Sequence, residues 1–311
     1  MIATSKPTKR NYNYFRQYGI LYAMLALPIV YFIVFKYVPM TYIQIAFKKF
    51  NLFKNVWSME WAGNNGMQYF IQAFKDRDFW YALSNTLTLN LLDLVAGFPA
   101  PIILAILLNE LAFKKFKKFT QTIVYIPHFL SWIIISGLAL QLLAPTTGLL
   151  NLLIIKMGGK AIPFLNVPSN WVGSYIVLGI WQSVGWNTII YLAAVTGINS
   201  ELYESASVDG ANRMHRIWHI TLPGLRPTIV VLLILALGRI FGSEFDRPYA
   251  LSNNLVSSAS NVISTYVYTK GIRGSQFSLT TAVGLFQSVI CVLFLIGANA
   301  LAEKFGEKGV M

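Results

Sequence analysis

The 311-residue chain is 55% hydrophobic and only 12% charged, with a mean hydropathy of +0.54. A soluble domain typically carries about 25% charged residues, so this composition argues against a soluble globular protein and favours one that crosses a membrane several times. The formal net charge is +13. In a soluble protein that charge would suggest nucleic acid, but basic loops facing the headgroups of membrane lipid explain it here, and no nucleic-acid partner is expected.

The start of the chain combines basic residues with an apolar run. Four basic residues precede the run, as in a secretion signal. No small-residue cleavage site follows, and the run is long enough to span a bilayer, so we expect a retained membrane anchor. Cys291 is the only cysteine, so no disulfide can form within the chain.

Six apolar stretches approach the ~20 residues that a helix needs to cross the hydrocarbon core. They lie at roughly 19–35, 80–108, 119–143, 171–198, 225–241 and 278–301. The second and fourth exceed one crossing, which predicts tilt or an extension into a loop. Pro28, Pro99, Pro101 and Pro127 are expected to kink their helices. The sequence therefore predicts an all-α, polytopic membrane protein with six transmembrane helices.

The distribution of basic residues predicts the orientation. Lys and Arg are about twice as dense in segments 1–18, 112–120, 199–226 and 303–311 as in the alternate loops, and such segments face the cytoplasm. We expect a cytoplasmic tail at 1–18, a six-helix domain at 19–302 and a second cytoplasmic tail at 303–311. The loops at 36–79, 144–170 and 244–277 would then be external. The first is rich in aromatic residues, which fit either a membrane-interface belt or a contact surface for an external partner, and the second is predicted to be irregular.

A polar loop at 199–223 separates the fourth and fifth apolar stretches. It carries Glu204-Ser205-Ala206, then Asp209-Gly210, then Ile220-Thr221-Leu222-Pro223. The residue types predict a surface part that docks into another protein.

The local signals in this loop predict two short helices. Asn199 or Ser200 is placed to cap the first, with acidic residues favoured in its first turn. Gly210 permits the left-handed conformation that ends it. Asn212 is placed to cap a second short helix ending near His219, after which Leu222-Pro223 is expected to halt the chain before the fifth span.

Motifs for catalysis and metal binding are missing from the sequence. There is no phosphate-binding Gly-x-x-x-x-Gly-Lys-[Ser/Thr], His-Glu-x-x-His, Cys-x-x-Cys or Gly-x-Ser-x-Gly. His215 and His219 have metal-ligand spacing, but no acidic or thiol partner lies nearby. We therefore expect no catalytic residue, cofactor or metal in this chain and an energy source outside it.

The spacing of the 199–223 loop resembles that of binding-protein-dependent importer permeases, in which Glu-Ala-Ala, Gly and Ile-x-Leu-Pro recur at these intervals. Ser205 replaces the usual middle Ala. The strings at 35–40, 45–48, 97–101, 125–129 and 265–268 are similar to those of the oligo- and polysaccharide subgroup of sugar permeases.

The resemblance implies the fold of a type I ABC importer permease in a bacterial cytoplasmic (inner) membrane. It implies a second homologous permease subunit, two cytoplasmic ATP-binding subunits that hold ATP and Mg, and an extracellular or periplasmic solute-binding protein. The residues it assigns to coupling with the ATPase are Glu204, Ser205, Ala206, Asp209, Gly210, Ile220, Leu222 and Pro223.

Polar side chains inside the apolar stretches are candidates for a substrate path, because such groups are expensive in a membrane. Asp93 is a further polar group at membrane depth, which we do not count among the candidates. Two tryptophans flank amides in the fourth stretch, which suits sugar rings. The candidates are Asn90, Trp181, Gln182, Trp186, Asn187, Arg239 and Gln287. Two alternatives stay open, namely interhelical hydrogen bonds and an ion pair of Arg239 with Glu244 or Asp246.

Three rival functions can be compared with import of a saccharide. A secondary transporter usually shows inverted repeats, and no such halves are evident. A membrane enzyme would need catalytic clusters that the sequence lacks. An importer permease for a non-sugar solute such as amino acids would keep the same loop and is the principal alternative.

Overall fold

The computed structural model of the chain describes residues 11–242 and 244–304. Within these ranges the protein is helical, and the only extended pairing is an isolated bridge between Lys48 and Trp61. The α-helices are α1 (Asn11–Phe32), α2 (Val38–Met40), α3 (Gln68–Lys75), α4 (Arg77–Leu92), α5 (Pro99–Asn109), α6 (Lys114–Tyr125), α7 (Trp132–Leu143), α8 (Leu149–Lys156), α9 (Pro168–Thr196), α10 (Ser200–Val208), α11 (Arg213–Arg216), α12 (Leu222–Gly238), α13 (Asp246–Leu251), α14 (Ser257–Ser260), α15 (Ile263–Val267) and α16 (Phe277–Lys304).

Turns of π-helix and 3-10 helix extend several of these helices. The π-helical segments are Ile33–Tyr37, Asp93–Gly97, Ile217–Thr221 and Tyr268–Arg273. The 3-10 segments are Thr41–Phe47, Val56–Ser58, Ile126–Phe129 and Asn254–Val256.

Five described helical runs are long and apolar enough to cross a membrane. They are Tyr18–Phe47, Arg77–Asn109, Pro168–Thr196, Arg213–Gly238 and Phe277–Lys304. A sixth crossing exists only if Lys114–Phe129 and Trp132–Leu143 count as one broken span, because they meet at 104°. The expected third span is therefore sharply bent, since Pro127 lies in the 3-10 turn that ends its first half and Ser131 caps its second half.

The helix of the second span continues past its two prolines without a break. Pro99 and Pro101 lie in the first turn of α5, directly after the π-helical turn Asp93–Gly97 and Phe98. A missing N–H is tolerated at the start of a helix, and a π turn can re-register the hydrogen bonds that precede it. The run Arg77–Asn109 consequently continues past both prolines.

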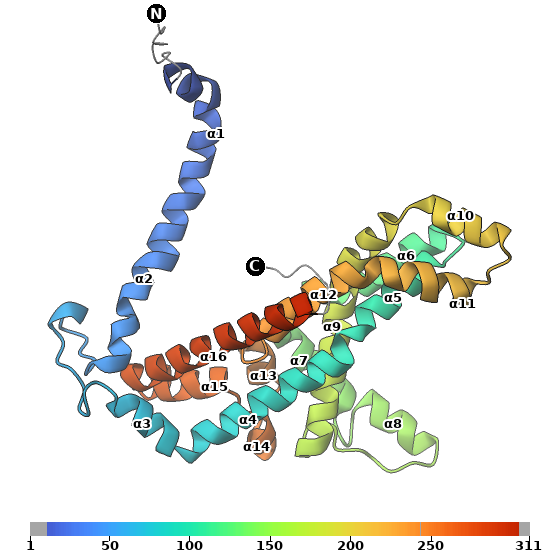
Figure 1. Ribbon diagram of the computed structural model, residues 1–311. Coiled ribbons are helices and arrows are strands. Elements are labelled where there is room, and N and C mark those ends of the chain that lie inside the picture. The colour runs from blue at the N-terminus through green and yellow to red at the C-terminus, as the bar shows by residue number, and fades with distance from the viewer. Residues whose placement is uncertain (1–10, 243, 305–311) are drawn as a thin grey trace, which may run out of the picture.

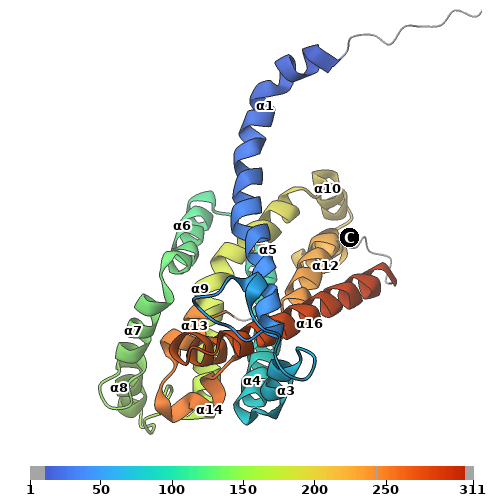
Figure 2. The same cartoon turned by 90° about the vertical axis from the view of Figure 1, so that its left-hand side faces the viewer.

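The two ends of the bundle carry different loops. In both views α6 and α10 lie at one end, while α3, α8 and α14 lie at the other (Figures 1 and 2). This places the lysine-rich start of α6 on the same side as the 199–223 loop, as the charge pattern predicts.

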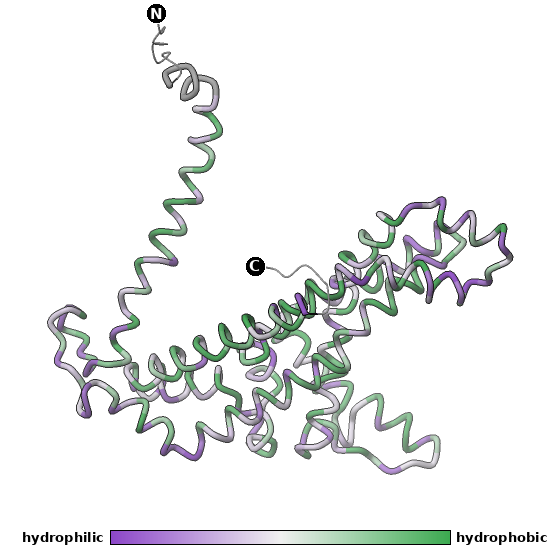
Figure 3. The backbone as a smooth tube through the Cα atoms, viewed as in Figure 1, coloured by the Kyte–Doolittle hydropathy of each residue, from purple (hydrophilic) through white to green (hydrophobic). Residues whose placement is uncertain are grey.

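Helix α1 stands apart from the bundle in Figure 1 and is largely hydrophobic in the part coloured in Figure 3. None of the most apolar window of Tyr18–Phe47 is buried in this chain, and Ile20 and Leu27 are 78% and 76% exposed. An apolar helix of this kind needs lipid or another protein around it.

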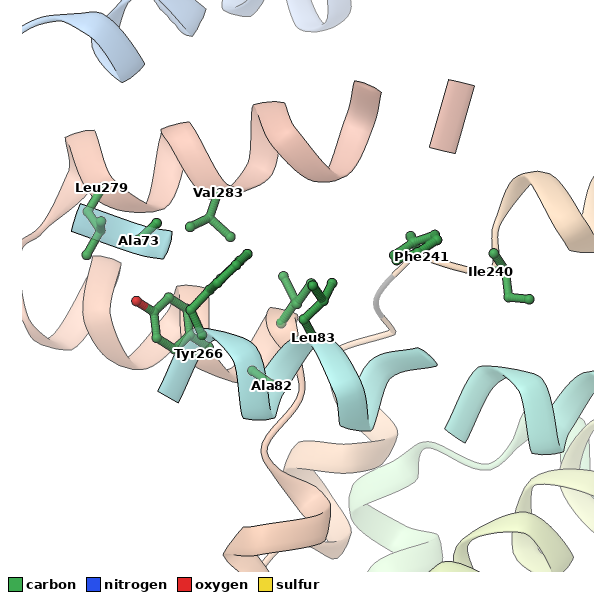
Figure 4. Close-up of a cluster of buried hydrophobic side chains, with 10 residues drawn as sticks. Ala73, Ala82, Leu83, Ile240, Phe241, Tyr266, Leu279 and Val283 are labelled. Atoms are coloured by element: carbon green, nitrogen blue, oxygen red, sulfur yellow. The ribbon is translucent and has the colours of Figure 1, made fainter. Parts of the chain in front are cut away.

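The segment expected as the third external loop is partly built into the core. Ile263 and Tyr266 of α15 pack with Phe79 and Leu83 of α4 and Val283 of α16 in the cluster of Figure 4. A second buried cluster joins Leu251 and Val256 to Trp171, whose indole donates to the carbonyl of Leu251 at 2.8 Å. Buried apolar residues thus fold this segment back between the spans.

The second external loop also differs from expectation, because it contains helix α8. Asn151 of α8 is fully buried. Its amide donates to the carbonyls of Ala144 and Ile162 at 3.0 and 2.9 Å, and its Oδ1 accepts from the Ile162 backbone at 2.7 Å. The side chain of Asn151 therefore joins the segment before α8 to the segment after it.

Candidate functional site

Helix α10 begins and ends as its sequence signals predict. Asn199 provides the cap, because its Oδ1 accepts from the Glu201 backbone N–H at 3.0 Å. Gly210 has φ of +75°, and the N–H of Ala211 returns to the carbonyl of Ala206 at 2.8 Å. This left-handed termination satisfies carbonyls at the end of the helix.

The expected second short helix is only the start of a longer one. Asn212 caps α11, with its Oδ1 accepting from the His215 N–H at 2.9 Å. The prediction that Leu222-Pro223 halts the chain is wrong: α11, the π-helical turn Ile217–Thr221 and α12 form one continuous run, Arg213–Gly238. Pro223 lies in the first turn of α12 after the π turn, where a proline does not break a helix.

The two arms of the loop are joined to each other. The Tyr203 hydroxyl lies 3.0 Å from Thr221 Oγ1, and Arg216 Nη1 donates to Ser207 Oγ at 3.0 Å. At the base, a Cβ added to Gly224 would lie 2.6 Å from Ile198 Cδ1. These contacts tie α10 to the segment that continues into α12.

The outer face of this loop is open to a partner. Of the eight predicted coupling residues, Glu204, Ser205, Asp209, Gly210 and Pro223 are exposed, and Ala206, Ile220 and Leu222 are half-buried. Large apolar side chains are also uncovered, with Val208 88%, Trp218 62%, Met214 61% and Leu202 51% exposed. Glu204 has no hydrogen bond or ion pair with any described residue, so it is available for an external contact. The roles of these residues in coupling stay predictions.

A cavity of about 500 Å³ lies between the second, fourth and fifth spans. That size falls within the range of small-molecule sites, roughly 300–1,000 Å³. Its wall is apolar apart from a few side chains, which are Asn90, Asp93, Ser183, Asn187, Tyr191, Arg239 and Arg247.

An ion pair forms one wall of the cavity. Arg247 donates to both carboxylate oxygens of Asp93, at 2.7 and 3.1 Å, and to the carbonyl of Tyr175 at 2.6 Å. Its guanidinium lies 3.6 Å from the centre of the Tyr175 ring and 5.4 Å from that of Trp132. Gly179 leaves the space that this guanidinium fills, since a Cβ there would lie 2.1 Å from Nη2. The pair fastens α13 to the second and fourth spans.

Three of the predicted substrate-path residues meet at the cavity, namely Asn90, Asn187 and Arg239. Asn90 is already engaged, because its amide donates to the carbonyls of Ile240 and Gly242 at 2.7 and 2.9 Å. Gln287 does not line the cavity and donates to the carbonyl of Phe241. Asn90 and Gln287 thus hold the non-helical end of the fifth span, as the alternative of interhelical hydrogen bonds anticipates.

The remaining three candidates lie on other faces of α9. Trp186 stacks on His128 with ring centres 4.6 Å apart, and Gln182 Nε2 donates to the His128 carbonyl at 3.4 Å. Trp181 and Trp186 are 43% and 45% exposed. They do not line the cavity, and a role in a path shared with another subunit stays a prediction.

Sequence reasoning missed Arg247, the main cation of the site. It pairs with Asp93 and also lies 3.9 Å from Glu244, whereas the alternative considered from sequence gave Glu244 or Asp246 to Arg239. Arg239 makes no ion pair within residues 11–242 and 244–304. The available signal was Asp93 itself, because a carboxylate inside an apolar stretch requires a cation.

No metal centre is formed by the described residues, which contain no group of three or more His, Cys, Asp or Glu side chains arranged to hold an ion. His215 and His219 stack with ring centres 5.6 Å apart, and their Nδ1 atoms lie 3.2 Å from Asn212 Oδ1 and 2.9 Å from the His215 carbonyl, respectively. The pair belongs to the local structure of α11 and of the π-helical turn that follows it.

Comparison with protein families matches residues 97–306 to the binding-protein-dependent transport system inner membrane component. The polygalacturonan/rhamnogalacturonan transport system permease protein YteP of Bacillus subtilis is 45% identical over 294 residues, covering 94% of this chain and 91% of the relative. The protein LplB of B. subtilis is 43% identical over 291 residues, covering 93% and 90%.

Comparison with solved structures gives the same result. A chain of a bacterial ABC transporter that imports the acidic polysaccharide alginate superposes with a TM-score of 0.85 at 38% identity, covering 95% of this chain and 99% of that one. The same score and identity are found for the alginate transporter in complex with an alginate pentasaccharide-bound periplasmic protein, where 97% and 100% are covered.

Proposed function

Because the chain belongs to the binding-protein-dependent transport system inner membrane components, we propose that it forms half of the translocation pore of an ATP-driven importer of oligosaccharides or polysaccharide fragments. The observation that carries the proposal is the continuous helical run Arg213–Gly238, which connects the exposed 199–223 loop to the cavity beside Arg239. Movement of the loop would therefore be transmitted directly to the cavity wall.

The class of substrate is inferred from the relatives. The permease YteP is named for polygalacturonan and rhamnogalacturonan, and the superposed structures belong to an alginate importer. The high coverage of both chains favours a saccharide for this permease as well. An amino-acid permease would share the loop and is the alternative that the experiment below addresses.

A second permease subunit would complete the pore. The exposed apolar surface of α1 and the uncovered tryptophans of α9 fit burial against such a subunit, which we take to be a homologous chain. A solute-binding protein would deliver the saccharide from outside, at the end of the bundle that carries α3, α8 and α14. Both termini and the 199–223 loop would lie in the cytoplasm of the host.

Energy would come from two separate ATP-binding subunits that hold ATP and Mg, and this chain would carry no catalytic group. Glu204, Ser205, Ala206, Asp209 and Gly210, together with Ile220, Leu222 and Pro223, would form the part that docks on one ATPase. Closure of the ATPases on ATP would push α10, tilt the fifth span and open the pore towards the binding protein. Hydrolysis and release would return the pore to its inward-open state.

Deletion of the gene tests the substrate class. We expect loss of growth on one oligosaccharide or polysaccharide fragment, with amino-acid uptake unchanged, and restoration by the wild-type gene. Loss of amino-acid uptake with normal growth on every saccharide would favour the alternative.

A further inference from the structure

Arg239 places a charge at the cavity end of the fifth span, and it has no partner among the residues that the structure describes. It follows Gly238 at the end of α12 and lies about 21 Å along the helix from Leu225, at 1.5 Å per residue. The hydrocarbon core is ~30 Å thick. Within residues 11–242 and 244–304 its guanidinium makes no hydrogen bond, ion pair or ring contact, and it lines the cavity. A charge at such a depth is expensive, which makes Arg239 a candidate functional residue.

The carboxylate of Asp93, which also lines the cavity, does not supply the missing partner. The charged residues of the cavity wall are Asp93, Arg239 and Arg247. Both oxygens of Asp93 are engaged by Arg247. Glu244 lies 3.9 Å from Arg247 and borders a separate small void instead of the cavity. The cavity wall therefore carries an excess positive charge, located at Arg239.

The part of the cavity wall formed by α9 offers neutral hydrogen-bonding groups. Asn187 of α9 lines the cavity, and its amide has no hydrogen-bond partner within the described residues. Ser183 lies one turn earlier on the same face. Its hydroxyl donates to the carbonyl of Gly179 at 2.8 Å, so the acceptor side of this hydroxyl remains for a ligand. An amide and a hydroxyl both donate and accept hydrogen bonds, as sugar hydroxyl groups require.

We propose that this cavity binds a uronate residue, a sugar ring bearing a carboxylate, with Arg239 pairing the carboxylate and Asn187 bonding the ring hydroxyls. Guanidinium groups bind carboxylates through two parallel hydrogen bonds, which fix orientation as well as charge. The inference rests on the proposed import of saccharides and adds that the permease itself selects acidic ones.

A carboxylate from the second permease subunit is the competing partner for Arg239. In that case the guanidinium would hold the two permeases together, and its removal would weaken assembly instead of selectivity. The subunit content of the purified complex separates these roles.

The test uses the complete importer in liposomes, with both permeases, the ATPases and the binding protein. The probes are trimers of galacturonate, glucuronate and mannuronate, each beside its carboxyl-reduced neutral trimer. We expect the wild-type importer to take up at least one acidic trimer at least about tenfold faster than its reduced form, because a polar site rejects analogues that leave its groups unpaired.

Variants of the permease, each assayed with the same binding protein, show whether the permease itself determines this selectivity. Arg239→Gln should lower uptake of the acidic trimer by about tenfold or more, Arg239→Lys should retain part of it, and Asn187→Ala should lower it less than Arg239→Gln. Lys160→Gln, which removes an exposed charge outside the spans, should behave as wild type.

Three results would overturn the inference. They are equal uptake of an acidic trimer and its reduced form by the wild type, unchanged acidic uptake in Arg239→Gln, and loss of the second permease from the purified Arg239→Gln complex. Import of neutral saccharides alone would overturn only this inference, whereas import of no saccharide by the intact assembly would overturn the proposed function.

Discussion

The contact between Gly179 and Arg247 gives a sharp test of how the cavity is built. An alanine Cβ at position 179 would lie 2.1 Å from Nη2, 2.3 Å from Cζ and 2.7 Å from Nη1 of Arg247. No rotation of the planar group in place relieves three such overlaps. Gly179→Ala should therefore expel the guanidinium from its bonds with Asp93 and Tyr175.

The free-energy cost of Gly179→Ala follows from the loss of the cation that pairs with Asp93. The side chain of Arg247 is 6% exposed and that of Asp93 is 29% exposed, so expulsion strands a mostly buried carboxylate. Breaking a buried pair costs about 3–5 kcal/mol, and the partial exposure of Asp93 favours the lower end. Alanine regains about 0.5–1 kcal/mol in a helix interior, so we expect a net destabilisation of about 2 kcal/mol.

Gly173→Ala is the matched control, because it lies on the same helix and an added Cβ meets nothing within 4 Å. Thermal unfolding of the purified complex should show a lower apparent midpoint for Gly179→Ala and an unchanged or slightly higher one for Gly173→Ala. In an Arg247→Ala background, Gly179→Ala should add little, since the two changes remove the same contacts. Equal midpoints for Gly179→Ala and Gly173→Ala would refute the reasoning.

Three further outcomes follow from the same geometry. Gly185→Ala should reduce the amount of folded protein more than Gly179→Ala does, because its Cβ would lie 2.0 Å from the backbone oxygen of Val124; normal yield would contradict that packing. Gly210→Val, at a φ of +75° with open space around it, should cost about 1–3 kcal/mol locally and lower uptake or ATPase retention, whereas Gly210→Asn, which tolerates this conformation, should not; identical uptake by both variants would remove the support for a shape-dependent loop. In a cysteine-free background, an impermeant thiol reagent applied to intact cells should label a cysteine at Asn254 and spare one at Ser207, and the reverse pattern would overturn the orientation.

Local signals predicted the 199–223 loop well because each acts within a few residues. The Asn199 cap contacts a backbone N–H two positions away, and the left-handed conformation of Gly210 depends on the absence of its own side chain. The continuation of the helix past Pro223 was not predictable in this way. It depends on the π-helical turn Ile217–Thr221, which has no sequence signal as strong as proline.

The cavity was only partly predictable because its contacts are distant in sequence. Asp93 and Arg247 are 154 positions apart, and the pairing depends on how the third external segment folds back into the bundle. The pattern of apolar stretches predicted that Arg247 lies in the external loop 244–277, and a basic residue in an exposed loop needs no partner. Asn187 and Arg239 were recognised because an isolated polar residue within an apolar stretch is a local signal.

Uptake by the reconstituted assembly tests the central claim most directly. Liposomes would contain this chain, its second permease and the ATPases, with the binding protein and a labelled oligosaccharide outside and ATP inside. We expect uptake only when ATP and the binding protein are both present, and no ATP binding or hydrolysis by this chain purified alone. Uptake without ATP, or stoichiometric binding of ATP to the isolated chain, would contradict the account.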